Sequence, residues 1–180
     1  MNEVRIISEK GIDFLKALEG EVKVNGRHRL YDDHNGKAIL TGGNPVGFPT
    51  IGHGHLLTQS ENSCGYLFIY DKKISWLKGI TDEEAEELLD YELDRFETTV
   101  VNSVKIPLEQ HEIDALIVFA FNVGRTAFKN STLLKVLNKG MYDEVPNQLN
   151  RWVYTNGHKS AGLASRRLRT GRLFSEGQYA

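Results

Sequence analysis

The 180-residue sequence has few of the features that mark secreted or membrane proteins. Its one cysteine, Cys64, excludes a disulfide within the chain and is typical of folding in a reducing compartment. No run of about 18 apolar residues occurs, so we expect no stable membrane insertion. Residues 1–5 do not combine a basic start with an apolar core, so we expect no secretory signal peptide.

An excess of charge of either sign is also missing, because 22 Lys and Arg stand against 24 Asp and Glu. A near-neutral total argues against nucleic acid as the main partner. Acids gather at 81–97 and bases at 121–180, which indicates either two solvated faces or a basic lobe that meets a polyanion. Nothing in the sequence indicates a cofactor or an oligomer, so we expect a monomer that binds no cofactor.

A helix is predicted to begin after Ser8 and to run to about Leu18, where Glu19-Gly20 ends it. A carboxyl group at that end feels the negative pole of the helix dipole, which disfavours its ionisation. Glu19 is therefore well placed for a proton donor, although a glutamate near a helix end is more often a solvated surface residue.

The remaining pattern predicts an α+β domain over 1–180, in which a small antiparallel β-rich lobe packs on a mainly helical lobe. Turn signals at 22–57 predict short strands at 29–31, 38–40 and 50–51, with Asn35-Gly36 as the main hairpin turn. Residues 66–70 fit either a strand or the edge of a helix. We place the β-rich lobe at about 20–60 and the helical lobe at about 80–180 with the N-terminal helix. Helices are predicted from Thr81, at 108–122 (buried and central), 132–138, 142–151 and 162–174.

The candidate catalytic residues are two carboxylates and a hydroxyl. Glu19 is followed by Asp32 and Asp33, and then by Thr50 beside a glycine-rich turn. Two carboxyls that flank a sugar bond can cleave it with water. Neighbours on an extended segment point to opposite sides, so at most one of Asp32 and Asp33 faces a given site.

The segment His53-Gly54-His55 is a weak signal for a metal. Two histidines one residue apart share a face of a strand, but no further ligand spacing accompanies them. We therefore expect no metal site, and we interpret at least one of these histidines as a hydrogen-bonded residue of the core or the site.

Together these segments resemble the phage-type lysozymes, glycoside hydrolase family 24. The matching segments are Leu18-Glu19-Gly20, Leu30-Tyr31-Asp32-Asp33, Thr50 to Thr58, Ile80 to Ala85, Phe119 to Gly124, Phe128 to Leu133, Arg151-Trp152, Gly162-Leu163, Arg166-Arg167 and Arg169-Thr170-Gly171. They run in family order through most of the chain, and the Thr-Ile-Gly-x-Gly-His block is specific.

The resemblance implies a lysozyme-like fold and hydrolysis of the β-1,4 bond between N-acetylmuramic acid and N-acetylglucosamine in peptidoglycan. It makes Glu19 the proton donor, Asp33 the second carboxylate because it lies two residues after Tyr31, and Thr50 the hydroxyl beside the attacking water. The residues expected to contact substrate are Tyr31, His53, His55, Leu56, Asn122 and Arg166.

Two features depart from the family pattern. Asp33 and Thr50 are 17 positions apart, which is more than relatives have. We interpret the added residues, including Thr41 to Pro45, as an extended hairpin, or alternatively as an insert that moves Asp33 out of the catalytic position. His53 stands where relatives carry tyrosine or a large apolar residue. Such a group could make activity depend on pH near neutrality.

The resemblance implies an endolysin that stays in the host cytoplasm before release and then cuts the cell wall, or a delivered antibacterial effector of the same chemistry. Three alternatives stay open. They are a non-catalytic wall-binding or morphogenesis module on the same fold, a lytic transglycosylase, and a metal-dependent wall peptidase that uses His53 and His55.

Overall fold

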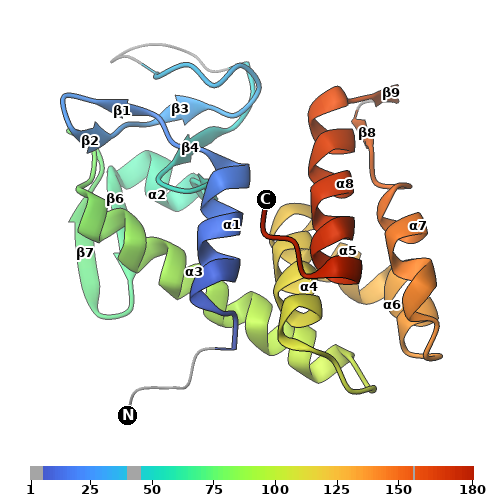
Figure 1. Ribbon diagram of the computed structural model, residues 1–180. Helices are drawn as coiled ribbons and strands as arrows, with labels where there is room; N and C mark the ends of the chain where they lie inside the picture. The colour runs from blue at the N-terminus through green and yellow to red at the C-terminus, as the bar shows by residue number, and fades with distance from the viewer. Residues whose placement is uncertain (1–5, 40–45, 156) are drawn as a thin grey trace. The chain divides into compact units, whose positions relative to one another are not determined.

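The computed structural model describes residues 6–39, 46–155 and 157–180, which form the α+β fold that the sequence predicts (Figure 1). The helices are α1 (Glu9–Glu19), α2 (Gln59–Cys64), α3 (Asp82–Ser103), α4 (Gln110–Val123), α5 (Arg125–Asn130), α6 (Thr132–Leu137), the 3-10 helix η1 (Tyr142–Glu144), α7 (Val145–Leu149) and α8 (Ala161–Glu176). The strands are β1 (Lys23–Val24), β2 (Arg27–His28), β3 (Tyr31–Asp32), β4 (Pro49–Ile51), β5 (His55–Leu56), β6 (Tyr66–Ile69), β7 (Lys72–Ser75), β8 (Tyr154–Thr155) and β9 (His158–Lys159). No helix in these ranges is apolar over a length that could cross a membrane.

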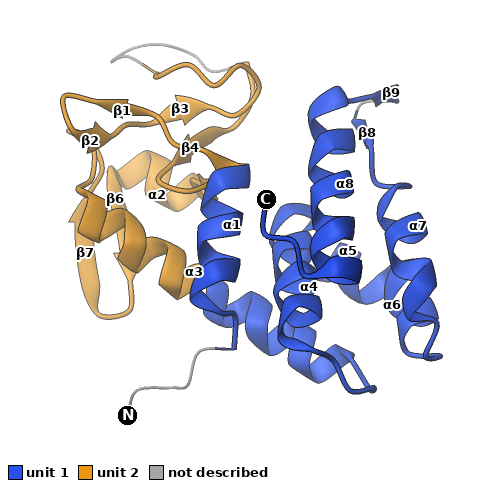
Figure 2. Ribbon diagram, in the orientation of Figure 1, with its two compact units in different colours: residues 1–18, 93–180 blue, residues 19–92 orange. Residues whose placement is uncertain are grey.

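The chain divides into two compact units (Figure 2). Unit 1 comprises residues 1–18 and 93–180, and unit 2 comprises residues 19–92. Unit 1 is built from helices with the short β8–β9 hairpin, whereas the strands β1 to β7 all belong to unit 2.

Unit 2 contains a three-stranded antiparallel sheet in the order β3-β4-β5. Its register sets Thr50 opposite Tyr31 on one side and opposite Leu56 on the other. The hairpin turn predicted at Asn35-Gly36 is confirmed, since Tyr31 bridges Ala38 and the backbone N–H of Asp32 donates to the carbonyl of Lys37. The rest of the predicted hairpin, Leu40 and the segment Thr41 to Pro45, lies outside the described residues.

The core of unit 2 lies beneath this sheet. It consists of Ile51, Leu67, Ile69, Ile80, Ala85 and Leu88. The ambiguous segment at 66–70 is a strand, because Leu67 and Ile69 alternate into this core while β6 pairs with β7. A period of two over so short a stretch cannot be told from a helix edge by sequence alone.

Unit 1 is organised around α4, and the predicted buried central helix is confirmed. Residues 114–120 of α4 are all buried, and α8 packs along α4. Phe119 makes edge-on ring contacts with Phe128 and Trp152, and the guanidinium of Arg167 lies over its face. α4 begins two residues later than predicted, since the Glu112 carboxylate accepts the N–H of Glu109 just before the helix. The predicted helix at 142–151 is divided into η1 and α7.

Both ends of α1 are fixed by side chains of unit 1. Its predicted cap is confirmed, since the Ser8 hydroxyl accepts the N–H of Gly11 and donates to the fully buried carboxylate of Asp114. At the other end, Arg166 donates to the carbonyl of Leu18 at 2.6 Å. A cation beside the last carbonyls of a helix interacts favourably with the negative end of the helix dipole. It also satisfies a carbonyl that has no hydrogen-bond partner within the helix. The helix that carries Glu19 is thus held in register at each end.

Candidate active site

Glu19 is the last residue of α1 and lies against the turn that joins β4 to β5. The side chain is half-buried, and a Cβ added at Gly54 would lie 3.1 Å from Glu19 Oε2. Gly54 also has a φ of +93°, in the left-handed region that L side chains rarely adopt. Glycine at this position therefore lets the carboxyl group approach the backbone of the turn.

Asp32 and Asp33 have different surroundings, which the sequence could not distinguish. The buried Asp32 carboxylate accepts the backbone N–H groups of His34, Val46 and Gly47, at 2.9, 2.7 and 3.0 Å. Burial would raise the pKa of Asp32, but these N–H donors together lower it. Asp32 therefore closes the loop between β3 and β4.

Asp33 is exposed and is linked to Thr50 through the backbone of Phe48. The N–H of Phe48 donates to Asp33 Oδ1 at 2.6 Å, and the Thr50 hydroxyl donates to the carbonyl of Phe48 at 3.1 Å. A Cβ at Gly47 would overlap Asp33 Oδ1, so this position also requires a residue without a side chain. Asp33 and Thr50 are thus positioned by the same short segment.

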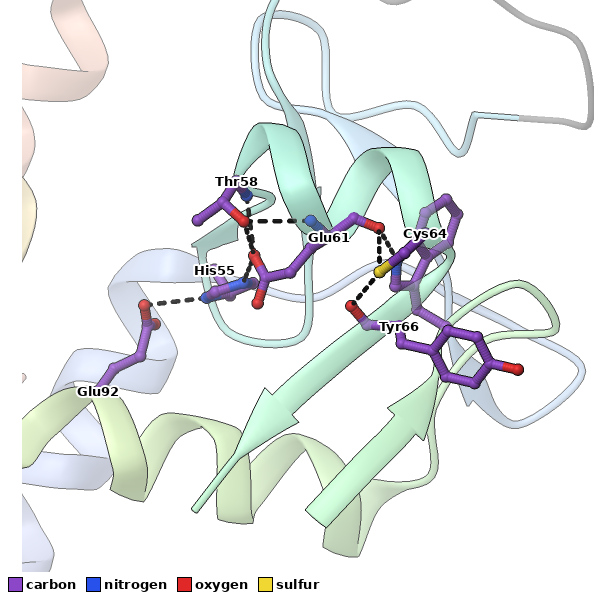
Figure 3. Close-up of polar contacts among 7 residues, drawn as sticks. His55, Thr58, Glu61, Cys64, Tyr66 and Glu92 are labelled. Atoms are coloured by element: carbon purple, nitrogen blue, oxygen red, sulfur yellow. Dashed lines mark hydrogen bonds and ion pairs between the residues drawn. The ribbon is translucent and has the colours of Figure 1, made fainter. Parts of the chain in front are cut away.

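His55 lies between two carboxylates of the protein (Figure 3). Its Nδ1 is 2.9 Å from Glu92 of α3, and its Nε2 is 3.2 Å from Glu61 of α2. Burial alone would lower the pKa of His55, but the two carboxylates outweigh it and raise the pKa to about 9. Burial would likewise raise the pKa of Glu61, but hydrogen bonds from His55 and Thr58 lower it to about 2. The ring is therefore a buried imidazolium near neutral pH.

The other residues expected to contact substrate lie in different settings. Tyr31 is buried in β3, and Leu56 is 51% exposed directly opposite Thr50. His53, between Gly52 and Gly54, is 9% exposed and packs edge-on against His28. Substrate contact at these positions stays a prediction.

Asn122 and Arg166 belong to unit 1, whereas Glu19, Asp33 and Thr50 belong to unit 2. Asn122 accepts a hydrogen bond from the buried guanidinium of Arg167, which also donates to the carbonyl of Trp152. Arg166 is engaged by Leu18 at the end of α1. Substrate contact at Asn122 and Arg166 also stays a prediction.

Sequence reasoning missed three parts of this site: Glu61, Glu92 and the backbone of Phe48. Thr58 and Glu61 form a capping box at the start of α2, and that signature could have located the helix and its glutamate. Glu92 stands in a run of nine acids at 81–97, where nothing in the pattern singles it out.

Comparison with known proteins agrees with this fold. Residues 26–170 match the family described as Phage lysozyme. The chain is 33% identical over 173 residues to the endolysin of Salmonella phage P22, covering 93% of this chain and 97% of that protein. It is 32% identical over 172 residues to the endolysin of Bacillus phage B103, covering 96% of this chain but only 55% of that protein's length. A solved endolysin from Escherichia coli O157:H7 phage FAHEc1 superposes with a TM-score of 0.72 at 27% identity, over 99% of this chain and 98% of that one.

The fold is therefore that of a lysozyme. The chain belongs to the phage lysozyme family, as its sequence motifs indicated.

The charges around His55 predict how stability changes with pH. A histidine whose pKa rises from about 6.5 to about 9 on folding stabilises the protein fully below pH 6.5, and this stabilisation is lost as pH rises through 9. Glu61 has the opposite sign, and its contribution is lost as pH falls from about 4.5 toward 2. We expect the stability advantage of the native protein over His55→Gln to fall by up to about 3 kcal/mol between pH 6 and pH 9.5.

Urea unfolding at a series of pH values measures this advantage directly. His158→Gln, at an exposed histidine of β9, is the matched control and should give the same pH profile as the native protein. A native advantage over His55→Gln that stays constant from pH 6 to pH 9.5 would contradict the buried imidazolium.

Proposed function

We propose that this chain is a muramidase that hydrolyses the β-1,4 bond between N-acetylmuramic acid and N-acetylglucosamine in peptidoglycan. The observation that supports it most is the approach of the Glu19 carboxyl group to Gly54, in the same unit as Asp33 and Thr50. One carboxyl group and one carboxylate–hydroxyl pair are the functional groups that such a hydrolysis needs.

In the proposed reaction Glu19 donates its proton to the glycosidic oxygen as the bond to the anomeric carbon breaks. A water molecule attacks that carbon, and Asp33 accepts a proton from it. The Thr50 hydroxyl orients this water by hydrogen bonding. The products are two shorter glycans, one of which has a new reducing end, and Asp33 passes the proton back through solvent.

Asp33 is the better candidate for the base because of what already binds each carboxylate. Asp32 accepts three backbone N–H groups and the side-chain amide of Asn35, which leaves little capacity for a water. Asp33 is exposed, and within the described parts of the chain its carboxylate and its N–H bond to Phe48. Its remaining lone pairs can therefore receive a proton.

We assign His55 and Arg166 to positioning. Both ring nitrogens of His55 bond to Glu61 and Glu92, so the imidazolium holds β5 in place instead of approaching a sugar. Arg166 holds the last turn of α1 through Leu18. Leu56, exposed opposite Thr50, remains the best placed of the predicted substrate contacts in unit 2.

The names of two relatives support a biological role. Relatives from Salmonella phage P22 and Bacillus phage B103 are endolysins, and we propose the same role here, with lysis of the host cell after the protein leaves its cytoplasm. A non-catalytic wall-binding module and a lytic transglycosylase remain the competing functions, and the first experiment below separates both from a hydrolase.

Glu19→Gln keeps the shape of the side chain but cannot donate the proton. We expect its turnover of permeabilised Gram-negative cells, followed as loss of turbidity, to fall by about 100-fold or more with little change in Tm. Glu9→Gln, at the exposed start of α1, is the matched control and should retain native turnover. The native protein should release muropeptides with reducing ends by mass spectrometry. Anhydro products would assign a transglycosylase, and an inactive native protein would assign a binding module.

Asp33→Asn and Asp32→Asn distinguish the proposed catalytic base, Asp33, from the carboxylate that closes the loop, Asp32. Asp33→Asn should lower turnover by about 100-fold, and its Tm should stay close to native because asparagine can still accept the Phe48 N–H. Asp32→Asn should lower Tm more, because the asparagine NH₂ group would face backbone N–H donors and cannot accept hydrogen bonds from them. Turnover and Tm measured on both variants decide the assignment. A larger loss of turnover in Asp32→Asn at a temperature where both are folded would reverse it.

A further inference from the structure

A second cluster of ionisable side chains lies in unit 2, apart from the proposed catalytic groups. Glu21 precedes β1, His28 is on β2, and His53 is in the β4–β5 turn, yet one ligand atom from each lies within 4.8 Å of the others. Both histidines are buried, with His28 only 1% exposed. Reciprocal backbone hydrogen bonds between His28 and Ile80 bring a fourth group, Asp82, to the same place.

From this geometry we propose that Glu21, His28, His53 and Asp82 form a binding site for Zn²⁺. The donors are two imidazoles and two carboxylates, a set that zinc accepts in tetrahedral coordination. Hard cations such as Mg²⁺ and Ca²⁺ prefer oxygen ligands alone, so nitrogen donors select against them.

The distances fit this coordination. His28 Nε2 is 3.1 Å from Asp82 Oδ1 and 3.6 Å from Glu21 Oε2. Around a tetrahedral zinc with bonds of about 2.0–2.1 Å, neighbouring ligand atoms lie about 3.3 Å apart, between those two values. No pair in the Glu21–His28–His53 group exceeds 4.8 Å, so closing the set requires a shift of at most about 1.5 Å. Glu21 and Asp82 are exposed enough to supply it, at 43% and 62%.

The protonation states are also suitable, since zinc binds neutral imidazole and ionised carboxylate. Burial lowers the pKa of His28, and the charge of Lys23 lowers it further. A hydrogen bond from Lys23 lowers the pKa of Glu21 and is the main cause of the lowered pKa of Asp82.

Lys23 shows that these oxygens already attract a cation. Its ammonium lies 2.9 Å from Glu21 Oε2 and 3.0 Å from Asp82 Oδ1, the same two atoms that face His28. The ammonium and a metal ion therefore compete for these oxygens. The Lys23 side chain is one-third exposed and can turn to solvent when the ion enters. Competition with Lys23 therefore distinguishes binding at this site from binding to scattered surface histidines.

A bound ion would join the start of unit 2, β2, the β4–β5 turn and the start of α3. His53 is next to Gly54, the residue that Glu19 approaches, so the ion would also stabilise that turn. Zinc binding does not depend on the proposed hydrolysis, and its test needs no substrate.

The test is isothermal titration of the whole chain with ZnCl₂ at pH 7.5, with MgCl₂ as the comparison cation. We expect one zinc per chain and no uptake of magnesium. Glu21→Gln removes an exposed ligand and should weaken zinc binding about tenfold or more. His158→Gln, at an exposed histidine of unit 1, should bind as the native protein does. Lys23→Met should bind several-fold more tightly, because it removes the competing ammonium.

Thermal unfolding of the same proteins gives an independent readout, since an ion that binds only the folded state raises Tm. Zinc should raise the Tm of the native protein and of Lys23→Met, and should raise that of Glu21→Gln less. Circular dichroism confirms that each variant is folded, and the exposed Glu21 keeps the test valid even if His28→Gln does not fold. The proposal is overturned by an absence of zinc binding, by binding that Glu21→Gln leaves unchanged, or by binding that Lys23→Met does not strengthen.

Discussion

The arrangement of unit 2 depends on the two hydrogen bonds that His55 makes with Glu61 and Glu92. A charged ring in a buried position is costly unless it is paired, and both of its nitrogens are paired here. Since Glu61 is on α2 and Glu92 on α3, the pairing ties β5 to two helices at once. Through the register of β5 with β4, the same bonds fix Thr50 and the turn at Gly54.

Glycines and main-chain groups position the other catalytic candidates of the site. At Gly54 the missing side chain gives the Glu19 carboxyl group its place, and at Gly47 it makes room for the carboxylates of Asp32 and Asp33. Phe48 contributes only its amide and carbonyl, yet these bind Asp33 and Thr50 respectively. In each case close approach, rather than side-chain chemistry, explains the residue.

The strongest sequence patterns predicted the elements that the structure contains. Ser8 and Gly20 bound the first helix, and the buried central helix predicted at 108–122 is α4. Local signals suffice for such features because caps and periodicity act within a few residues. The short elements α2, α5, β1, β2, β5, β7, β8 and β9 were missed, since two to six residues carry too little pattern. Partners such as Glu92 for His55 arise from long-range packing that no spacing encodes. For the same reason the sequence identified Asp32 and Asp33 as candidates but could not show which carboxylate binds the backbone N–H groups of the loop.

The account depends most on the approach of Glu19 to the turn, and Gly54→Ala tests it most directly. The added methyl group would lie 3.1 Å from the carboxyl oxygen and displace it. Gly140→Ala is the matched control, because Gly140 has a comparable φ of +77° but open space around its Cβ position. Measured on peptidoglycan at a temperature where both are folded, Gly54→Ala should lose most of its turnover while Gly140→Ala keeps it. Native turnover in folded Gly54→Ala would contradict the placement of the proton donor.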